Sequence, residues 1–472
     1  MALSSSNAHI EDEFNHASRI SIEDTKENST KEYSSLSVAQ KYGILAIVAT
    51  AAFLSTLSAN IYFPALGVIQ KDLHTTPELI NLTVSLYMVF QGLSPSFWAP
   101  LADQWGRRPV YLATTTVYLI ANIALSLAPN YPAVLVFRML QAFGSGPVIA
   151  LGAGCISDIA NPTERGIFFG IYTAGPQVSF AFGPVIGGII AQNLGWRWIF
   201  WVLVIFAGVL LIAITFLLRE TLRSLVGDGS GYANPTPSQW LKKHVKRDCP
   251  GSTTDYSRFL HCPNMLKPLI YAFQPDIGLC LIYNAIAYSI FYAMLASYSG
   301  LLETIYELDQ LDTGLCYMPT GIGCILGSIV GGKILDRDFR IISKRHNYDV
   351  KILTRSSLDI DYPVYAARLR TVWINHTIFS GKKANLTSEI IPSHFDLIWF
   401  HAADQSAFSL DLGIPIHLAA VTASIAPGIT YLGVQYMFLM LGMILLLSNV
   451  VLWVVKRKGP AWRKRRAENT DS

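Results

Sequence analysis

Charged residues are scarce in this sequence. Asp, Glu, Lys and Arg make up 14% of its 472 residues, whereas soluble domains carry roughly 25%. The deficit is concentrated in long charge-free runs, such as residues 42–70, 79–102 and 109–137. Since about 20 apolar residues cross a bilayer as a helix, these runs argue against a soluble globular protein. The sequence therefore predicts an all-α polytopic membrane protein.

Signals for other protein classes are also missing. The first 40 residues are polar and contain no apolar stretch, so they show no cleavable signal peptide and predict a disordered cytosolic tail. There is no nucleophile–base pair, HExxH or phosphate loop, so we expect neither an enzyme nor a cofactor. Cys249 and Cys262 lie near His244 and His261 in a polar loop. Their spacing matches no short CxxC pairing, so reduced thiols are favoured over a metal site.

Nine apolar runs can be read directly from the sequence. The predicted spans cover residues 42–63, 79–101, 109–128, 132–157, 167–192, 198–218, 277–302, 313–335 and 436–455. Basic turns follow the second, fourth and sixth spans, which places these turns in the cytosol by the positive-inside rule. The basic C-terminal tail should also be cytosolic, and this requires one more span after Asp336, for which residues 413–431 are the best candidate. The sequence thus predicts ten spans.

The predicted organisation follows from these spans. It comprises a tail (1–40), a six-helix N-terminal half (41–220), a central cytosolic loop (221–275), the start of a second half (276–340), an atypical polar segment (341–410), a last helical hairpin (411–455) and a basic cytosolic tail (456–472). Spans two and eight both end in a small residue followed by Asp and then Arg, at Asp103 and Asp336. This weak internal repeat predicts two homologous halves.

The turn after span two combines a carboxylate with two adjacent arginines. Asp103 ends a helix, where the helix dipole disfavours an anion, so it needs a cation such as Arg107 or Arg108. Asp158, at the cytosolic end of span four, can join them in this topology. The pattern predicts an ion-pair latch that holds one conformation, with ordinary positive-inside topology as the alternative. The predicted latch residues are Asp103, Gly106, Arg107, Arg108, Asp158 and Asp336.

Arg138 is the one charge well inside an apolar run of the first half. An intramembrane arginine costs at least about 2.5 kcal/mol on insertion scales, so it should face the bundle interior or a water-filled cavity. The alternative is that it snorkels to the outer interface, because Pro132 lies at the outer end of the span. No Asp or Glu lies at mid-membrane in the clear spans, so the sequence names no proton carrier.

Three of these segments resemble motifs of the major facilitator superfamily, whose fold consists of two pseudo-repeated helical halves. Residues 101–109 resemble its loop between helices two and three. Residues 136–144 resemble its helix-four motif, which implies a role of Arg138 and Gln141 in proton coupling. The end of span five resembles its exporter motif, although Ser179 stands where a second glycine is usual. The residues that match the exporter motif are Gly170, Gly183, Pro184, Gly187 and Gly188.

The first two spans further resemble fungal drug:proton antiporters with twelve spans, of the quinidine-resistance type. The resemblance rests on residues 60–66, 81–84 and 91–98. It implies export of a small hydrophobic or cationic organic substrate in exchange for protons, through a cavity of aromatic and amide side chains. The predicted cavity residues are Asn60, Tyr62, Gln91, Tyr283, Asn284, Tyr288 and Tyr292. For any one tyrosine, core packing or an aromatic belt is an equally good interpretation.

The resemblance is incomplete in the second half. It covers residues 43–340 and 432–466, and only 413–431 remains where helices nine to eleven are expected. About two spans are therefore missing from the family pattern. Because alternating access rocks two helical halves around a central site, a transport-inactive or sensor-like remnant is one alternative. A nutrient uptake transporter is another, which the exporter motif argues against.

The remaining expectations concern location and partners. We expect a monomer in the lipid bilayer, at the plasma membrane rather than the vacuole, with no nucleic acid partner. Four N-x-S/T sequons begin at Asn28, Asn81, Asn375 and Asn385. Three of them should be cytosolic and Asn81 should lie too close to the bilayer, so we expect little glycosylation.

Overall fold

The computed structural model describes most of the chain up to Arg345 and parts of its C-terminal helix. The described residues are 35–160, 165–227, 229, 231–245, 274–345, 436–437, 440–444, 447–463 and 465. Several predicted features lie outside them: the tail before Ser35, Cys249 and Cys262, the polar segment after Arg345, the span at 413–431, and the sequons at Asn28, Asn375 and Asn385.

The first half is built of long helices joined by short turns. In chain order they are α2 (Val38–Asn60), the short 3₁₀ helix η1 (Phe63–Ala65), α3 (Leu66–Asp72), α4 (Pro77–Trp105), α5 (Arg107–Ser126), α6 (Tyr131–Ser145), α7 (Pro147–Ile159), α8 (Arg165–Asn193) and α9 (Arg197–Leu217). Side-chain oxygens of Ser37, Thr76 and Asn130 cap the N-termini of α2, α4 and α6, which satisfies backbone N–H groups that lack a helical partner. The first six predicted spans all fall on these helices.

Two predicted spans of this half are interrupted. The first span ends as an α-helix at Asn60 and continues through η1 and α3, with Pro64 in the first turn of η1, where a missing N–H is tolerated. The fourth span is divided at Gly146, and Pro147 opens α7. A Cβ atom on Gly146 would collide with Ser94, so this break lets α4 pack closely against it.

The second part of the chain begins within the predicted central loop. It consists of α10 (Arg223–Val226), α11 (Pro237–Val245), α14 (Pro275–Tyr306), α15 (Gln310–Cys316) and α16 (Met318–Arg345). The predicted eighth span differs from the structure, because it is divided between α15 and α16 at Tyr317 and α16 continues to Arg345. Basic residues in the last turn of α16 favour this extension, since they complement the helix dipole.

Within the described residues, seven helical segments are long and apolar enough to cross a membrane. α4 and α16 are of similar length, at 29 and 28 residues, and about 20 residues suffice to span a bilayer. These helices correspond to the nine runs that the sequence predicts directly.

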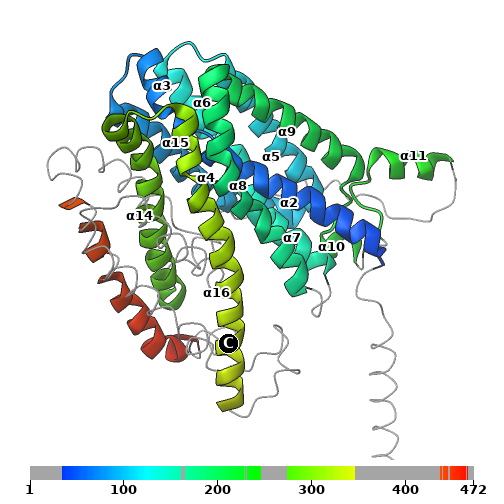
Figure 1. The fold of residues 1–472 in the computed structure, drawn as a ribbon. Coiled ribbons are helices and arrows are strands. Elements are labelled where there is room, and N and C mark those ends of the chain that lie inside the picture. The colour runs from blue at the N-terminus through cyan, green and yellow to red at the C-terminus, as the bar shows by residue number, and fades with distance from the viewer. Residues whose placement is uncertain are drawn as a thin grey trace, which may run out of the picture.

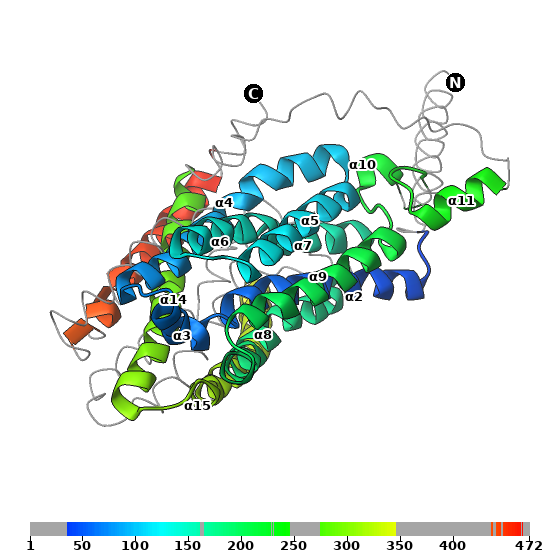
Figure 2. The ribbon, with the colours of Figure 1, turned by 90° about the horizontal axis from the view of Figure 1, so that it is seen from above.

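The two parts of the molecule meet at one end and separate toward the other. α2 packs along α8, and α8 also contacts α15 and α16, while α14 and α15 reach η1 and α3. Near α3 lie the end of α14, the short helix α15 and the start of α16 (Figure 1). The far end of α16 stands apart from α2 and α7 in Figure 1. Figure 2 shows α15 beside α8 from above. The positive-inside rule assigns the end with α3 and α15, called the outer end below, to the outside and the opposite end to the cytosol.

Candidate functional site

α8 forms the seam between the two parts of the molecule. A Cβ atom on Gly187 would collide with the carbonyl oxygen of Ile61 in the first half, and one on Gly188 would collide with that of Gln310 in the second. A Cβ on Gly183 would lie 2.9 Å from the Cβ of Asn60. The glycines at the end of the predicted exporter motif are therefore the points at which α8 touches both halves at once.

The second half approaches α8 through glycines of its own. A Cβ on Gly314 of α15 would lie 2.6 Å from the carbonyl oxygen of Pro184, and one on Gly321 of α16 would collide with Ala181. Gly170, the first glycine of the predicted motif, has open space around its Cβ position. The motif is thus tightly constrained at its end and unconstrained at its start in this conformation.

Asn60 fixes the first half to the middle of the seam. Its side chain is buried, with 1% of its surface exposed. Its Nδ2 donates hydrogen bonds to the carbonyl oxygen of Thr56 at 3.0 Å and to the hydroxyl of Ser179 at 3.4 Å. Ser179, the departure from the family pattern, therefore supplies a polar partner for Asn60.

A layer of aromatic rings, here called the aromatic plug, closes the space between the halves near the outer end. Phe63 stacks on Tyr317, with ring centres 6.3 Å apart and planes inclined by 9°. Phe180 of α8 meets Phe291 edge-on at 5.7 Å. The members of the aromatic plug are Phe63, Phe180, Phe291, Tyr292 and Tyr317, and all are at most 4% exposed. These buried rings therefore fill the space that they share between the two halves.

Polar contacts join the halves beyond the aromatic plug, and we call them the outer lock. The Nζ of Lys71 on α3 lies 2.5 Å from Oε1 of Glu303 on α14. Nε2 of Gln192 on α8 donates to Oδ2 of Asp309 at 3.5 Å, and its Oε1 accepts a hydrogen bond from the backbone N–H of Leu311 at 3.2 Å. The described residues of the two halves therefore meet at the outer end, while α16 diverges from the first half at the cytosolic end (Figure 1).

Arg138 lies inside the helix bundle and not at the interface, with 1% of its surface exposed. Its guanidinium carbon sits 4.0 Å from the ring centre of Tyr62 and 4.2 Å from that of Tyr87. Its Nη1 donates to Oε1 of Gln141 at 2.6 Å and to the carbonyl oxygen of Ser58 at 3.3 Å. Among the described residues no carboxylate forms an ion pair with Arg138. Ring quadrupoles and carbonyl dipoles stabilise this charge instead.

A polar network connects Gln141 to α5. Nε2 of Gln141 donates to Oδ1 of Asn122 at 2.7 Å, and the Asn122 amide donates to the carbonyl oxygen of Tyr118 at 2.7 Å. The Tyr118 hydroxyl lies 2.5 Å from that of Ser58 on α2. Sequence reasoning found Arg138 and Gln141 but missed Tyr87, Tyr118 and Asn122. Asn122, a single amide in the apolar run 109–128, was the available signal.

At the cytosolic turn, the structure brings together Asp103, Arg107 and Asp158. Nη1 of Arg107 lies 2.8 Å from Oδ1 of Asp103, and its Nε lies 3.4 Å from Oδ2 of Asp158. Arg108 does not join these ion pairs; it donates to the carbonyl oxygens of Thr215 at 2.7 Å and Pro235 at 2.8 Å. The side chain of Asp336 lies outside the described residues.

The same turn contains a carboxylate that the sequence analysis did not single out. Oε1 of Glu220 accepts from the backbone N–H of Arg107 at 2.8 Å, and Oε2 accepts from that of Arg108 at 3.3 Å. Gly106 has φ = +112°, and a Cβ there would also collide with the Glu220 carboxylate. Glu220 caps the first turn of α5, and Gly106 lets it approach. Its distance in sequence from the turn, 113 residues, hides this role.

The predicted cavity residues do not form one group. Tyr288 and Tyr292 lie together, with ring centres 4.8 Å apart and hydroxyls at 3.3 Å. Tyr283 instead packs against Leu452 and Val455 of the C-terminal helix. Gln91 lies on α4 beside Gly146, and the side chain of Asn284 lies outside the described residues. Of the predicted cavity residues, Asn60 therefore lies at the seam, Tyr62 lies against Arg138, and Tyr292 belongs to the aromatic plug.

Comparisons with known proteins agree with this architecture. The family model described as Major Facilitator Superfamily matches residues 48–347. Citrate exporter 1 of Aspergillus niger is 34% identical over 466 residues, covering 90% of this chain and 87% of the relative. Quinidine resistance protein 1 of Saccharomyces cerevisiae is 34% identical over 330 residues, covering 68% and 58%. The crystal structure of a D-xylose-proton symporter, 11% identical, superimposes with a TM-score of 0.57 over 87% of this chain and 97% of that one.

Proposed function

Because the chain belongs to the major facilitator superfamily, we propose that it exports small organic molecules from the cytosol in exchange for protons. The observation that carries this proposal is the seam along α8. Gly183, Gly187 and Gly188 end a segment that resembles the family's exporter motif, and they bring α8 against both halves. Close glycine contacts between helices allow two halves to move against each other with little rearrangement of side chains.

The closed outer end defines the step of the cycle that the structure represents. A substrate would enter from the cytosolic side, where the halves diverge (Figure 1). Release to the outside requires that Lys71 separate from Glu303 and that Phe63 separate from Tyr292 and Tyr317. The ion pairs of Arg107 with Asp103 and Asp158 are formed in this same conformation and join α4, α5 and α7, so they brace the cytosolic end of the first half. Opening of the outer contacts as the halves close at the cytosolic end would be alternating access.

Arg138 is the residue that we assign to proton coupling. A fixed buried positive charge favours deprotonation of nearby acidic groups and disfavours other cations, because the surrounding dielectric constant is low. Its hydrogen bonds reach Ser58 of α2 and Gln141 of α6, and its ring contacts reach Tyr62 and Tyr87. Any rearrangement of α2 against α4 and α6 during transport therefore changes the surroundings of this charge.

Two substrate classes follow from the site and the relatives. The aromatic pair Tyr288 and Tyr292 and the amide Asn60 suit a hydrophobic or cationic organic molecule, as the likeness to a quinidine resistance protein indicates. The second candidate is an organic anion. It is favoured by the buried Arg138, which has no carboxylate partner among the described residues, and by the likeness to a citrate exporter over most of the chain.

The test is transport by the full chain in a yeast strain that lacks its own exporters. Efflux of a fluorescent cationic drug and of labelled citrate would be measured at two external pH values, after surface expression is checked by biotinylation. Net efflux that increases with the inward proton gradient supports the proposal and selects the substrate class. Net accumulation would mean uptake. Surface delivery without flux of either probe would mean a transport-inactive remnant. The same cells would show whether the protein resides in the plasma membrane, as we propose.

A further inference from the structure

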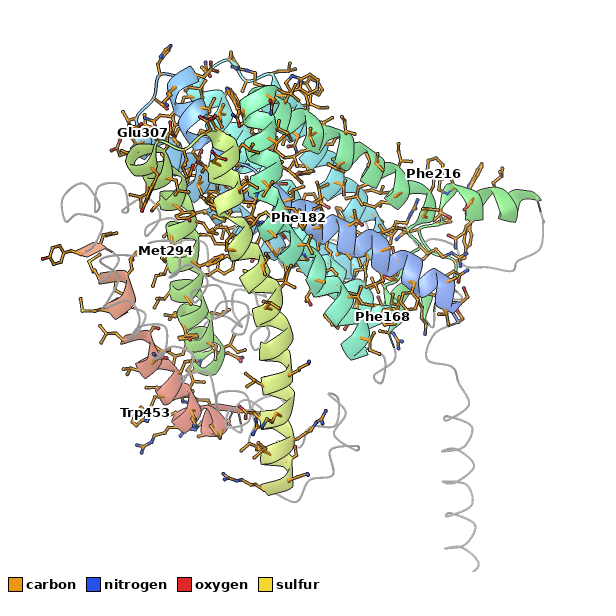
Figure 3. All side chains as sticks on the ribbon, viewed as in Figure 1. Phe168, Phe182, Phe216, Met294, Glu307 and Trp453 are labelled. Atoms are coloured by element: carbon orange, nitrogen blue, oxygen red, sulfur yellow. The ribbon has the colours of Figure 1, made fainter. Side chains whose placement is uncertain are left out.

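The cytosolic end of α16 presents a row of basic side chains. Lys333, Arg337, Arg340 and Lys344 follow one another at intervals of four, three and four residues, so they share one face of the helix. All four are exposed. Side chains that end in nitrogen project from this end of α16 (Figure 3).

This basic row has no acidic partner in the part of the chain that the structure describes. None of its members takes part in the ion pairs that the described residues form. With Ile341, the four residues line an open depression of about 350 Å³. Asp338 is buried and lies on another face of the helix, whereas Asp336 is three residues after Lys333 and four before Arg340 in the sequence. The row therefore has four basic residues against at most one neighbouring carboxylate, and an anionic ligand would reduce the remaining repulsion between like charges.

Apolar residues on the same face of α16 indicate what surrounds the basic row. Leu326 and Ile322 precede Lys333 by seven and eleven residues, which places them on that face. Both are 43% exposed. The face of α16 that packs on α8 is different and carries Gly321. A helix that faces lipid has an apolar exposed face, which becomes basic where the helix leaves the hydrocarbon on the cytosolic side. A path for polar substrates would instead carry polar side chains inside the membrane.

We propose that the basic row on α16 binds anionic phospholipid headgroups of the cytosolic leaflet. Lysine and arginine clusters directly cytosolic of a transmembrane helix attract such lipids. From Lys333 to Lys344 the helix rises roughly 16 Å, which is longer than a single layer of headgroups. The row therefore suits a multiply phosphorylated inositol lipid, whose phosphates project from the membrane surface, better than a lipid with one charge. The proposal concerns lipid binding and does not depend on the direction or substrate of transport.

Lipid binding to the basic row would also affect how α16 moves against α8. α16 packs on α8 through Gly321, which lies on the same helix as the basic row. A lipid that holds the cytosolic end of α16 at the membrane surface restrains the helix that must move when the halves rock. The ligand would thus bias the conformation in which α16 stands apart from the first half.

The test uses the purified full-length protein in detergent and a fluorescent short-chain phosphatidylinositol 4,5-bisphosphate. Its binding would be followed by fluorescence anisotropy, with a phosphatidylcholine carrying the same fluorophore as the reference probe. The test variant combines Lys333→Gln, Arg337→Gln, Arg340→Gln and Lys344→Gln. One control removes the same charge from the central loop, with Lys242→Gln, Lys243→Gln, Lys246→Gln and Arg247→Gln. A second control keeps the charge of the row, with Lys333→Arg and Lys344→Arg.

The expected result is an affinity for the anionic probe at least about tenfold weaker in the test variant, with little change in either control. Elution volume and unfolding temperature without lipid should match those of the wild type, because all four side chains are exposed. Wild-type affinity in the test variant would overturn the proposal. An equal loss in the central-loop control would also overturn it, because net charge alone would then explain binding. Displacement of the probe by citrate but not by unlabelled lipid would assign the row to a soluble anion instead.

Discussion

Tyr62 and Phe63 are consecutive in the chain, yet their rings belong to two different clusters. The Tyr62 ring lies 4.0 Å from the guanidinium carbon of Arg138, whereas the Phe63 ring stacks on Tyr317 of the second half. Both residues sit where α2 has ended and η1 begins. A change of backbone angles at this break would move both rings together. The buried charge of the first half and the contact between the halves are therefore physically connected.

Replacement of Arg138 should abolish proton-dependent efflux. Arg138→Ala removes the charge and leaves Gln141 without its 2.6 Å hydrogen bond, which should reduce the free energy of unfolding by about 1–3 kcal/mol. Arg138→Lys keeps the charge but loses the planar contacts with both tyrosines, so efflux should fall at least about tenfold. Efflux and surface expression would be measured in yeast as described above.

Arg197 offers a matched control for this variant. It also stacks on an aromatic ring, with its guanidinium carbon 4.2 Å from the ring of Trp196, but its side chain is 42% exposed. Arg197→Lys should change efflux by less than about twofold, since exposed cation–π contacts are weak. Equal losses in the Arg138 and Arg197 variants would contradict a special role of the buried charge.

Substitution of Gly187 and of Gly170 by alanine should have opposite effects on stability, because the two glycines of α8 have different surroundings. Gly187→Ala places a methyl group against the Ile61 carbonyl, and overpacking of this kind costs about 1–3 kcal/mol. Gly170→Ala adds a methyl group in open space, where alanine favours the helix by up to about 1 kcal/mol over glycine. Thermal unfolding of the two purified variants would measure this contrast. A lower unfolding temperature for Gly170→Ala than for Gly187→Ala would contradict the seam that we describe.

Loss of the outer lock should shift the molecule toward opening at its outer end. Lys71 is 75% exposed, so its ion pair with Glu303 is worth only about 0.2–1 kcal/mol. Lys71→Ala should therefore change the ratio of closed to open molecules by about fivefold at most. Spin labels on α3 and α14 would report the distance between them. The exchanged pair Lys71→Glu with Glu303→Lys should keep the short distance. An unchanged distance in Lys71→Ala would rule out a role for this ion pair.

The sequence predicts features that depend on local composition and short spacing. The spans follow from charge-free runs, and the latch of Asp103 and Arg107 follows from their spacing of four residues on adjoining helix ends. Contacts between distant segments are not visible in this way. Tyr317 and Phe63 are far apart in the sequence, and the residues around each of them do not predict that the two rings stack. Tyr283 and Tyr288 both lie in the apolar run at 277–302, yet Tyr283 packs against the C-terminal helix.

Glu220 shows the same limit and supports a last prediction. Its two carboxylate oxygens accept hydrogen bonds from the backbone of Arg107, Arg108, Thr221 and Leu222 and from the Asn234 amide. Glu220→Gln replaces one acceptor with an NH₂ group that faces donors, and the residue is only 6% exposed. The free energy of unfolding should fall by about 1–3 kcal/mol.

Glu78 provides the control, because it also lies in the first turn of a helix, α4, but is exposed. Glu78→Gln weakens the hydrogen bonds that this carboxylate accepts from Thr76 and from its own backbone N–H, together with its interaction with the helix dipole. All of these lie at an exposed site, where water and salt screen them. Denaturant unfolding of both purified variants would measure the difference. If the two substitutions cost the same, the carboxylate of Glu220 would contribute only its charge. A larger cost for Glu220→Gln means that its geometry fixes the turn between α4 and α5, and this turn carries Arg107 and its ion pairs with Asp103 and Asp158.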